Sequence, residues 1–191
     1  FRFSYSTNGF LIIGGRDSKD NELIVKKHME DNDIYFHADI IGAPHTILKT
    51  EGKVVKIEDK IDAAIIAACY SSAWKNKIYS LDVYSALPSQ VSKSPESGEY
   101  LTTGAFVIRG KKEYFKKCDL KLFIGIKDDV LIAGSENSIK KNCKDYIGLT
   151  IGDIKKTDIC KLLQKKFIKL GYNVNLDSLV SILPAGDFKF I

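Results

Sequence analysis

The feature that most restricts the fold of this chain is segment 57–76, in which apolar residues recur at helical spacing. The residues that share one face of this expected helix are Ile61, Ala64, Ile65, Ala68, Cys69 and Ser72. Glu58 and Asp59 near its start and Lys75 near its end suit the helix dipole, which favours such charges at those ends. A helix with a broad apolar face must bury that face against another element. Segment 57–76 therefore predicts a neighbouring sheet.

Short strand-like runs on both sides of this helix can supply that sheet. They are rich in β-branched and aromatic residues and occupy 1–6, 10–13, 34–38, 45–49, 81–87, 105–108, 120–126 and 130–133. The dipeptide Asn8-Gly9 between the first two runs is typical of a tight hairpin turn. Because helices are inserted among runs of strands, the sequence predicts an α+β fold with a mixed, largely antiparallel sheet.

The remaining segments predict shorter elements. Helices are expected at 18–29, 136–142, 157–170 and 176–183, a strand at 146–151, a long loop at 88–100 and a hinge between 115 and 120. Asp17 or Ser18 is the expected cap of the first of these helices, and Thr157 that of the third. We therefore expect a core domain at 1–127. A C-terminal α/β extension at 128–191 is expected to pack on this core or continue it.

Charge is unevenly distributed along the 191 residues, although the net charge is only +5. Residues 1–110 carry 13 Lys and Arg against 14 Asp and Glu, whereas residues 111–191 carry 16 against 10. This imbalance predicts an anionic partner, which by charge alone fits RNA, DNA or an anionic membrane. No apolar run approaches the roughly 18 residues of a membrane span. The chain begins without Met and at once in a strand-like run, so we expect a fragment of a longer protein.

The clearest candidate binding motif follows a short apolar strand. Arg109, Lys111 and Lys112 come directly after it, Gly110 lets the backbone turn between them, and Tyr114 adds a ring. Cations beside an aromatic ring suit a polyphosphate backbone whose bases can stack. The alternative is a strand that is followed by a solvated basic turn.

Two histidines, His37 and His45, are expected on neighbouring strands, and Asp39 shares a face with His37. A metal site is one interpretation, but no motif supplies a third strong ligand, and the scattered cysteines form no Cys-x-x-Cys pair. We favour hydrogen bonds from His37 and Asp39 to each other or to a loop backbone, with His45 lining a groove. Ser71 and Ser72 lack the strained turn of a serine hydrolase. We therefore expect no catalytic residue, no metal and no other cofactor.

Four further candidates are single residues. Arg16 follows two glycines and precedes a helix, where a phosphate can bind; a structural corner with the neighbouring aspartate is an equal alternative. Gln90 can contact a base edge or a 2′-hydroxyl and Lys93 a phosphate, unless both belong to a solvated loop. Lys75 ends the apolar helix beside Trp74, whose ring is expected to pack under the sheet rather than to stack on a base.

The order and spacing of these motifs resemble a known module. The motifs are Ile12-Ile-Gly-Gly-Arg-Asp17, Asp33-Ile-Tyr-Phe-His-Ala-Asp39, Gly42-Ala-Pro-His45, Cys69-Tyr-Ser-Ser-Ala-Trp-Lys75, Gln90-Val-Ser-Lys93 and the stretch from Gly98 to Lys112. Together they resemble the NFACT-R module of the NFACT family of ribosome quality-control factors, known in many bacteria as fibronectin-binding protein A homologues. The resemblance is dense up to about residue 127. It is loose over 128–191, in the manner of archaeal or compact eukaryotic members.

This resemblance implies a cytoplasmic RNA-binding module that is not itself an enzyme. The residues singled out above are the candidate RNA contacts of such a module: Arg16, His37, His45, Lys75, Gln90, Lys93, Arg109, Lys111, Lys112 and Tyr114. The implied partners are tRNA, the large ribosomal subunit, and the N-terminal module and coiled-coil arm of a full-length NFACT protein, with no membrane. In that family the whole protein promotes untemplated C-terminal tailing of stalled nascent chains.

Two alternatives are kept beside RNA binding. The first is a DNA-binding or DNA-sensing module, because a membrane-anchored relative with the same domain is implicated in sensing extracellular DNA. The second, less favoured, is a small hydrolase that uses His37 and Asp39.

Overall fold

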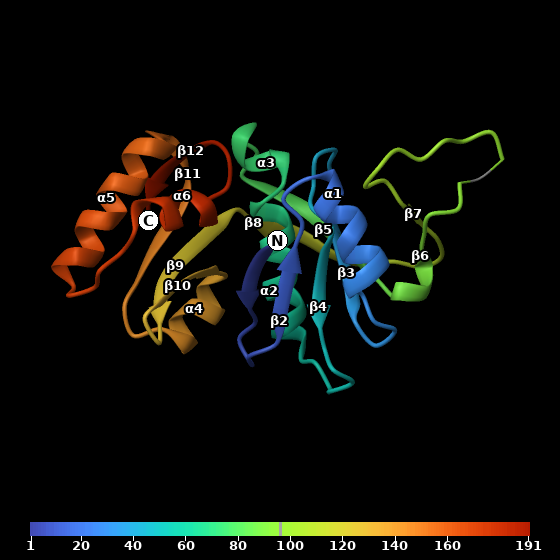
Figure 1. The fold of residues 1–191 in the computed structure, drawn as a ribbon, viewed down its shortest axis with the longest axis horizontal. Helices are drawn as coiled ribbons and strands as arrows, with labels where there is room; N and C mark the ends of the chain where they lie inside the picture. Colours follow the sequence, from blue (N-terminus) through green and yellow to red (C-terminus); the bar gives the residue numbers. More distant parts are fainter. Residues whose placement is uncertain (96) are drawn as a thin grey trace.

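A six-stranded antiparallel sheet contains most strands of the N-terminal part of the chain, in the order β1-β2-β4-β3-β5-β8. A computed structural model describes residues 1–95 and 97–191 (Figure 1). The strands of this sheet are β1 (Arg2–Tyr5), β2 (Leu11–Gly14), β3 (Ile34–Ala38), β4 (Thr46–Lys49), β5 (Ser80–Ala86) and β8 (Glu113–Asp119). The first two strands pair antiparallel around the Asn8-Gly9 turn, where Gly9 has a φ of 87°. The predicted hairpin is thus confirmed.

A second, four-stranded antiparallel sheet has the order β10-β9-β11-β12. Its strands are β9 (Lys121–Lys127), β10 (Val130–Gly134), β11 (Tyr146–Lys155) and β12 (Asp187–Phe190). The helices associated with it are α4 (Glu136–Asn142), α5 (Lys156–Lys169) and α6 (Leu176–Ile182). A small ribbon of β6 (Val91–Ser92) and β7 (Val107–Ile108) completes the strands of the described residues. The predicted α+β class with largely antiparallel sheets is confirmed.

The long apolar helix is shorter than its sequence pattern indicates. It ends as α2 (Ile57–Cys69), and a separate turn of helix, α3 (Ser72–Lys75), follows it. Ser71 causes the break, because its hydroxyl donates to the carbonyl of Ala68 and accepts from the backbone N–H of Ala73. The prediction of one continuous helix over 57–76 is therefore wrong. Of its predicted apolar face, Ala64, Ala68 and Cys69 are buried, whereas Ile61 is 40% exposed.

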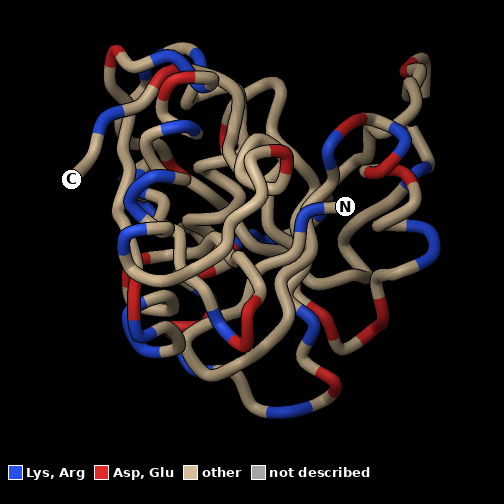
Figure 2. Tube along the Cα trace, turned by 60° about the vertical axis from the view of Figure 1, so that its left-hand side comes forward, with Lys and Arg blue, Asp and Glu red and all other residues tan. Residues whose placement is uncertain are grey.

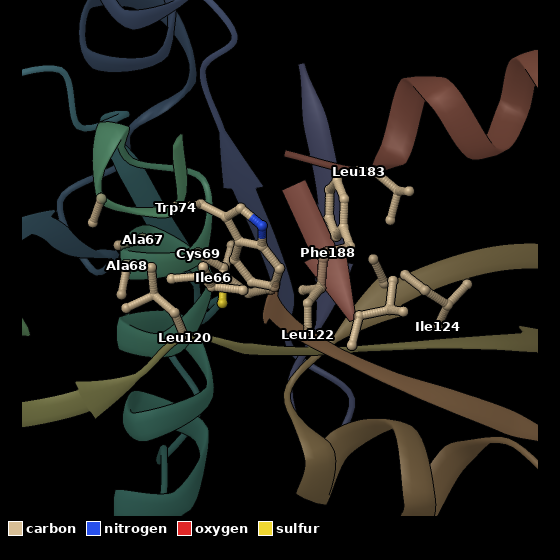
Figure 3. Close-up of a cluster of buried hydrophobic side chains, with 14 of the residues drawn as sticks. Ile66, Ala67, Ala68, Cys69, Trp74, Leu120, Leu122, Ile124, Leu183 and Phe188 are labelled. Carbon is tan, nitrogen blue, oxygen red and sulfur yellow. The ribbon is translucent and has the colours of Figure 1, made fainter. Parts of the chain in front are cut away.

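One hydrophobic core joins the two sheets. Buried residues of β2, β3, α2, β9, β11, α5 and β12 belong to a single cluster of contacting side chains. Figure 3 shows Ile66 of α2 beside Trp74, with Leu122 and Phe188 of the second sheet close to that ring. The rings of Trp74 and Phe188 lie 5.3 Å apart, and the indole Nε1 donates to the carbonyl of Asp187 at 2.9 Å. The packing interpretation of Trp74 is thus confirmed.

Several element boundaries differ from the sequence predictions. The helix expected at 18–29 is α1 (Ser18–Leu23), capped by Asp17, and it continues into a π-helical turn, η1 (Ile24–His28). The helix α5 begins at Lys156, so Thr157 lies inside it rather than capping it. Of the run 105–108, only Val107–Ile108 is a strand.

Three strands, β6, β8 and β12, lie where the sequence predicted none. Residues 113–119 form the edge strand β8 rather than a loop or hinge, and Leu120 alone joins this strand to β9. β12 near the C-terminus pairs with β11. Loop 88–100 contains a 3₁₀ turn, η2 (Pro88–Gln90), and β6; its residue Glu96 lies outside the described residues.

The boundary expected at residue 127 stays a prediction. The strands on its two sides, β9 and β10, are adjacent in one sheet. None of the helices in residues 1–95 and 97–191 has the length and apolarity that crossing a bilayer requires.

Candidate nucleic-acid interface

A cavity of about 630 Å³ lies on one face of the six-stranded sheet and collects several of the predicted residues. Tyr35 and His37 of β3 and Tyr84 of β5 line it from the sheet. Three loops form its walls, residues 15–18, 41–45 and 102–106. A larger cavity of about 920 Å³ lies between β10 and α6 and is lined by none of the predicted site residues.

His45 is built into this cavity by hydrogen bonds. Its Nδ1 lies 2.6 Å from the hydroxyl of Tyr35, its backbone N–H donates to the Asn21 side chain, and its ring bonds the backbone of Gly104. The residue is 6% exposed, and this burial, reinforced by the charge of His37, lowers its pKa to about 4. His45 is therefore neutral at pH 7.

His37 has a similar environment. Burial also lowers its pKa, against the opposing effect of hydrogen bonds to the backbone of Ala38 and Ala43 and of the charge of Asp39. Ala38 ends β3 and Ala43 belongs to the loop 41–45, and a loop backbone is one of the two partners favoured from the sequence. Within the described residues, no three His, Cys, Asp or Glu side chains gather as a metal site would need.

Five rings form a continuous row, which we call the aromatic track: Phe106, His45, His37, Tyr84 and Tyr114. Successive ring centroids lie 5.5, 5.3, 5.8 and 6.1 Å apart. Tyr84 is 9% exposed and Tyr114 48%, so the track emerges at the β8 edge of the sheet. Its members come from β3, β5, β8 and two loops, which is why no single sequence motif contains it.

Three lysines lie over rings of the aromatic track. The Nζ of Lys93 is 4.8 Å from the ring centre of Phe106, that of Lys112 is 4.6 Å from Tyr84, and that of Lys116 is 4.7 Å from Tyr114. Such contacts are cation–π interactions. Lys93, Lys112 and Tyr114 are among the residues predicted from the sequence, whereas Lys116, Tyr84 and Phe106 are not.

Lys93 also anchors the loop 102–106. Its ammonium donates to the carbonyls of Thr102 and Ala105 and forms an ion pair with Glu22 at 2.9 Å. The same Glu22 carboxylate accepts from the backbone N–H of Gly104. Bonds from Lys26, Gly104 and Lys93 together lower the pKa of Glu22 to about 2. One wall of the cavity is therefore held in place by charge-assisted hydrogen bonds.

Gln90 and Arg109 take structural positions at the base of the ribbon β6-β7. The Gln90 amide accepts from the N–H of Leu87 and donates to the carbonyls of Arg109 and Lys111. Gly110 has a φ of 79°, which lets the backbone present both carbonyls to one side chain. The guanidinium of Arg109 donates to the carbonyl of Ser94. Lys111 is exposed beside them.

Arg16 and Lys75 lie at different distances from the cavity. Arg16 lines it and donates to Ser181 of α6 at 2.8 Å. Lys75 is exposed at the end of α3, where its backbone approaches Gly186, and it does not line the cavity. The hydroxyls of Ser71 and Ser72 donate to the carbonyls of Ala68 and Ile41.

Arg2 is a cavity residue that the sequence did not indicate. Its guanidinium lies 4.5 Å from the ring centre of Tyr70, and its buried Nε has no hydrogen-bond partner among residues 1–95 and 97–191. Burial lowers its pKa, and the neighbouring charge of Arg16 lowers it further. The only sequence signal was the alternation of Arg2 with aromatic residues, which is typical of an exposed strand. Lys and Arg are otherwise spread over the whole trace among Asp and Glu, so charge alone does not locate a site (Figure 2).

Comparison with known proteins assigns the family. The model of the NFACT protein RNA-binding domain matches residues 1–110. The archaeal Rqc2 homologue aRqcH of Methanocaldococcus jannaschii is 37% identical over 188 residues, which is 96% of this chain and 28% of the relative. The human ribosome quality control complex subunit NEMF is 42% identical over 115 residues, 60% of this chain and 11% of the relative. The chain thus spans less than a third of the length of these relatives.

A solved structure has a similar fold. It is the C-terminal part of the fibronectin/fibrinogen-binding protein from Streptococcus suis, with a TM-score of 0.53 and 21% identity over 74% of this chain and 48% of that one. The family match covers β1 to β7 and includes most residues of the cavity and aromatic track. The chain belongs to the family of the NFACT protein RNA-binding domain.

Proposed function

We propose that this chain is the RNA-binding module of a ribosome quality-control factor and that its RNA is tRNA, large-subunit rRNA or both. The observation that carries the proposal is the aromatic track with Lys93, Lys112 and Lys116 over its rings. Rings stack on unpaired bases and cations contact phosphates, so their alternation suits a single-stranded part of a folded RNA. The names of the relatives support this assignment.

The proposed partners in the cell are the large ribosomal subunit and the other parts of a longer NFACT protein. The chain spans 28% of its archaeal relative, so those other parts have room for an N-terminal module and a coiled-coil arm. In such a protein this chain would hold RNA in the cytoplasm, while the whole factor supports C-terminal tailing of stalled nascent chains.

We further infer that the module binds without catalysing a reaction. His37 and His45 are neutral, and their rings are already hydrogen-bonded to Tyr35 or to loop backbone. A general base needs a nucleophile within reach, and the hydroxyls of Ser71 and Ser72 donate to backbone carbonyls. These contacts favour a binding surface over a hydrolase.

The test compares tRNA with duplex DNA at matched salt. Fluorescence anisotropy of labelled tRNA and of a duplex DNA with a similar number of phosphates should give at least tenfold tighter binding to tRNA. Log affinity should fall linearly with log salt for both, because phosphate contacts release counterions. Equal or tighter binding of duplex DNA would favour the DNA-binding alternative. Cleavage of tRNA that disappears in His37→Ala would favour the hydrolase.

A further inference from the structure

We propose that the cavity holds one unstacked nucleotide of the bound RNA, with the base among His37, Tyr84 and Phe106 and the phosphate on Arg2 and Arg16. This inference rests on the proposed RNA binding and specifies the kind of nucleotide bound. We call the cavity with these five residues the nucleotide pocket.

The size and lining of the nucleotide pocket suit such a ligand. Its volume of about 630 Å³ falls in the range of roughly 300–1,000 Å³ that is typical of small-molecule sites. The lining combines rings with a few polar groups, which is the usual composition of sites that orient a flat ligand. The imidazoles of His37 and His45 are neutral, so this end of the pocket favours an uncharged base over a phosphate.

The other end of the nucleotide pocket is cationic. Burial lowers the pKa of Arg2 and that of Lys156. The charge of Arg16 lowers the pKa of Arg2 further, and the charges of both arginines lower that of Lys156 further. Among the described residues, neither guanidinium forms an ion pair with a carboxylate, and the Nε of Arg2 is buried and unpartnered. A partly buried charge that lacks an ion-pair partner, such as that of Arg2, is costly. A phosphate offers both the negative charge and the acceptors that these groups lack.

Two nearby carboxylates are engaged elsewhere. One oxygen of Asp20 accepts from the backbone N–H of Arg16, while Asp17 caps α1 by accepting from the N–H of Asp20. The carboxylates of Asp17 and Asp20 therefore bond backbone N–H groups rather than the guanidinium groups of Arg2 and Arg16. Within the part of the chain that the structure describes, the guanidinium of Arg16 bonds only the neutral hydroxyl of Ser181, which a phosphate can replace.

Hydrogen bonds fix the pocket wall formed by residues 102–106 in the absence of RNA. Glu22 binds the N–H of Gly104, Lys93 binds the carbonyls of Thr102 and Ala105, and the His45 ring bonds the Gly104 backbone. Residues 102–106 are thereby fixed beside the rings of the sheet. Such preorganisation reduces the entropic cost of binding.

The experiment places 2-aminopurine in a single-stranded RNA of about a dozen nucleotides and in the same RNA annealed to its complement. Binding of the single strand should raise 2-aminopurine fluorescence, since the base leaves its stacked neighbours. Phe106→Ala should weaken single-strand binding by at least about fivefold, the lower end for loss of one stacked base. Arg16→Gln, on an exposed loop, should weaken it several-fold without lowering the melting temperature. Both variants should bind the duplex as the wild type does.

The matched control is Lys53→Gln, which removes one positive charge from an exposed turn at the opposite end of β4 from His45. It should leave the single-strand preference unchanged. Equal weakening of single-strand and duplex binding in Arg16→Gln would overturn the nucleotide pocket while leaving RNA binding intact. If free AMP binds as tightly as the RNA, the pocket binds free nucleotides, and the proposal that it holds a nucleotide of a bound RNA is wrong. A wild type that binds no RNA would instead overturn the proposed function.

Discussion

At the residue scale, His45 connects three segments that are distant in sequence. It joins Tyr35 of β3, Asn21 of α1 and Gly104 of the cavity wall through its ring and backbone. These bonds use the neutral ring, with Nδ1 beside a tyrosine hydroxyl whose own pKa is raised by burial. Protonation of His45 therefore opposes the folded arrangement.

This opposition predicts a pH-dependent stability. The pKa of His45 is about 4 in the folded chain against 6.5 ordinarily, so the unfolded chain binds the proton more strongly and stability falls as the pH drops through this window. Between pH 7.5 and 4.5 this group should remove about 2–3 kcal/mol from the free energy of unfolding, at roughly 1.4 kcal/mol per pKa unit. Urea unfolding of the wild type and of His45→Gln at both pH values measures this change in the free energy of unfolding. Identical pH dependence in the two proteins would contradict the assignment.

A second residue-scale prediction concerns Asp62, which is 1% exposed in α2. Its carboxylate accepts from the backbone N–H and hydroxyl of Thr7 and from the hydroxyl of Ser135, so it ties the first hairpin to the second sheet. Asp62→Ala leaves these donors unpaired and should cost about 3 kcal/mol or more, since bonds to charged groups contribute roughly 1.5–3 kcal/mol each. Glu58→Ala on the same helix, which loses one exposed bond to Asn8, is the control and should cost under about 1 kcal/mol.

The residues of the site were only partly predictable. Arg16, His37 and His45 were singled out from the sequence, and the fold brings them to one cavity. Arg2 and Tyr84 were not, because their positions depend on how β1 and β5 are placed across the sheet. Lys93 and Gln90 were identified, but their bonds to loop backbone depend on a ribbon, β6-β7, that two-residue strands do not signal.

At the element scale, β8 shows why a polar strand is difficult to predict from the sequence. Its sequence, Glu-Tyr-Phe-Lys-Lys-Cys-Asp, has no regular alternation, and its pairing with β5 shifts register between Leu81 and Val83. Lys117 has a φ of 51°, and its N–H donates to Asp82, which holds this irregularity. The buried strands β3 and β9, by contrast, carry apolar runs and were predicted almost to the residue.

The entry to β8 gives a prediction about phosphate contacts. Replacing Lys111 and Lys112 with Ala removes two cations but spares Arg109, which bonds Ser94. The slope of log tRNA affinity against log salt should flatten by about 1.4, at roughly 0.7 per single-strand contact. The matched control replaces exposed Lys165 and Lys169 of α5 with Ala and should leave the slope unchanged. The reverse result would place the RNA surface on α5.

At the scale of the whole molecule, the shared core predicts that both sheets unfold together. Trp74, the single tryptophan, contacts Phe188 of β12 and therefore reports on the junction. Thermal unfolding followed by tryptophan fluorescence and by far-ultraviolet circular dichroism should coincide. Phe188→Ala should cost about 3–5 kcal/mol and shift both transitions equally. Fluorescence that changes at a lower temperature than circular dichroism would show that residues 128–191 unfold separately.

Hydrogen bonds from Gln90 and Lys93 at the base of the ribbon β6-β7 make this chain convenient to label. Gln90 bonds the backbone carbonyls of Arg109 and Lys111, which follow β7, and Lys93 bonds those of Thr102 and Ala105, which precede it. Beyond them, a Cβ added at Gly98 would meet no atom of the described residues within 4 Å, and Tyr100 is 87% exposed. A fluorophore or affinity tag inserted between 98 and 100 would therefore lie beyond the hydrogen bonds of Gln90 and Lys93. We expect it to stay outside the nucleotide pocket and the aromatic track.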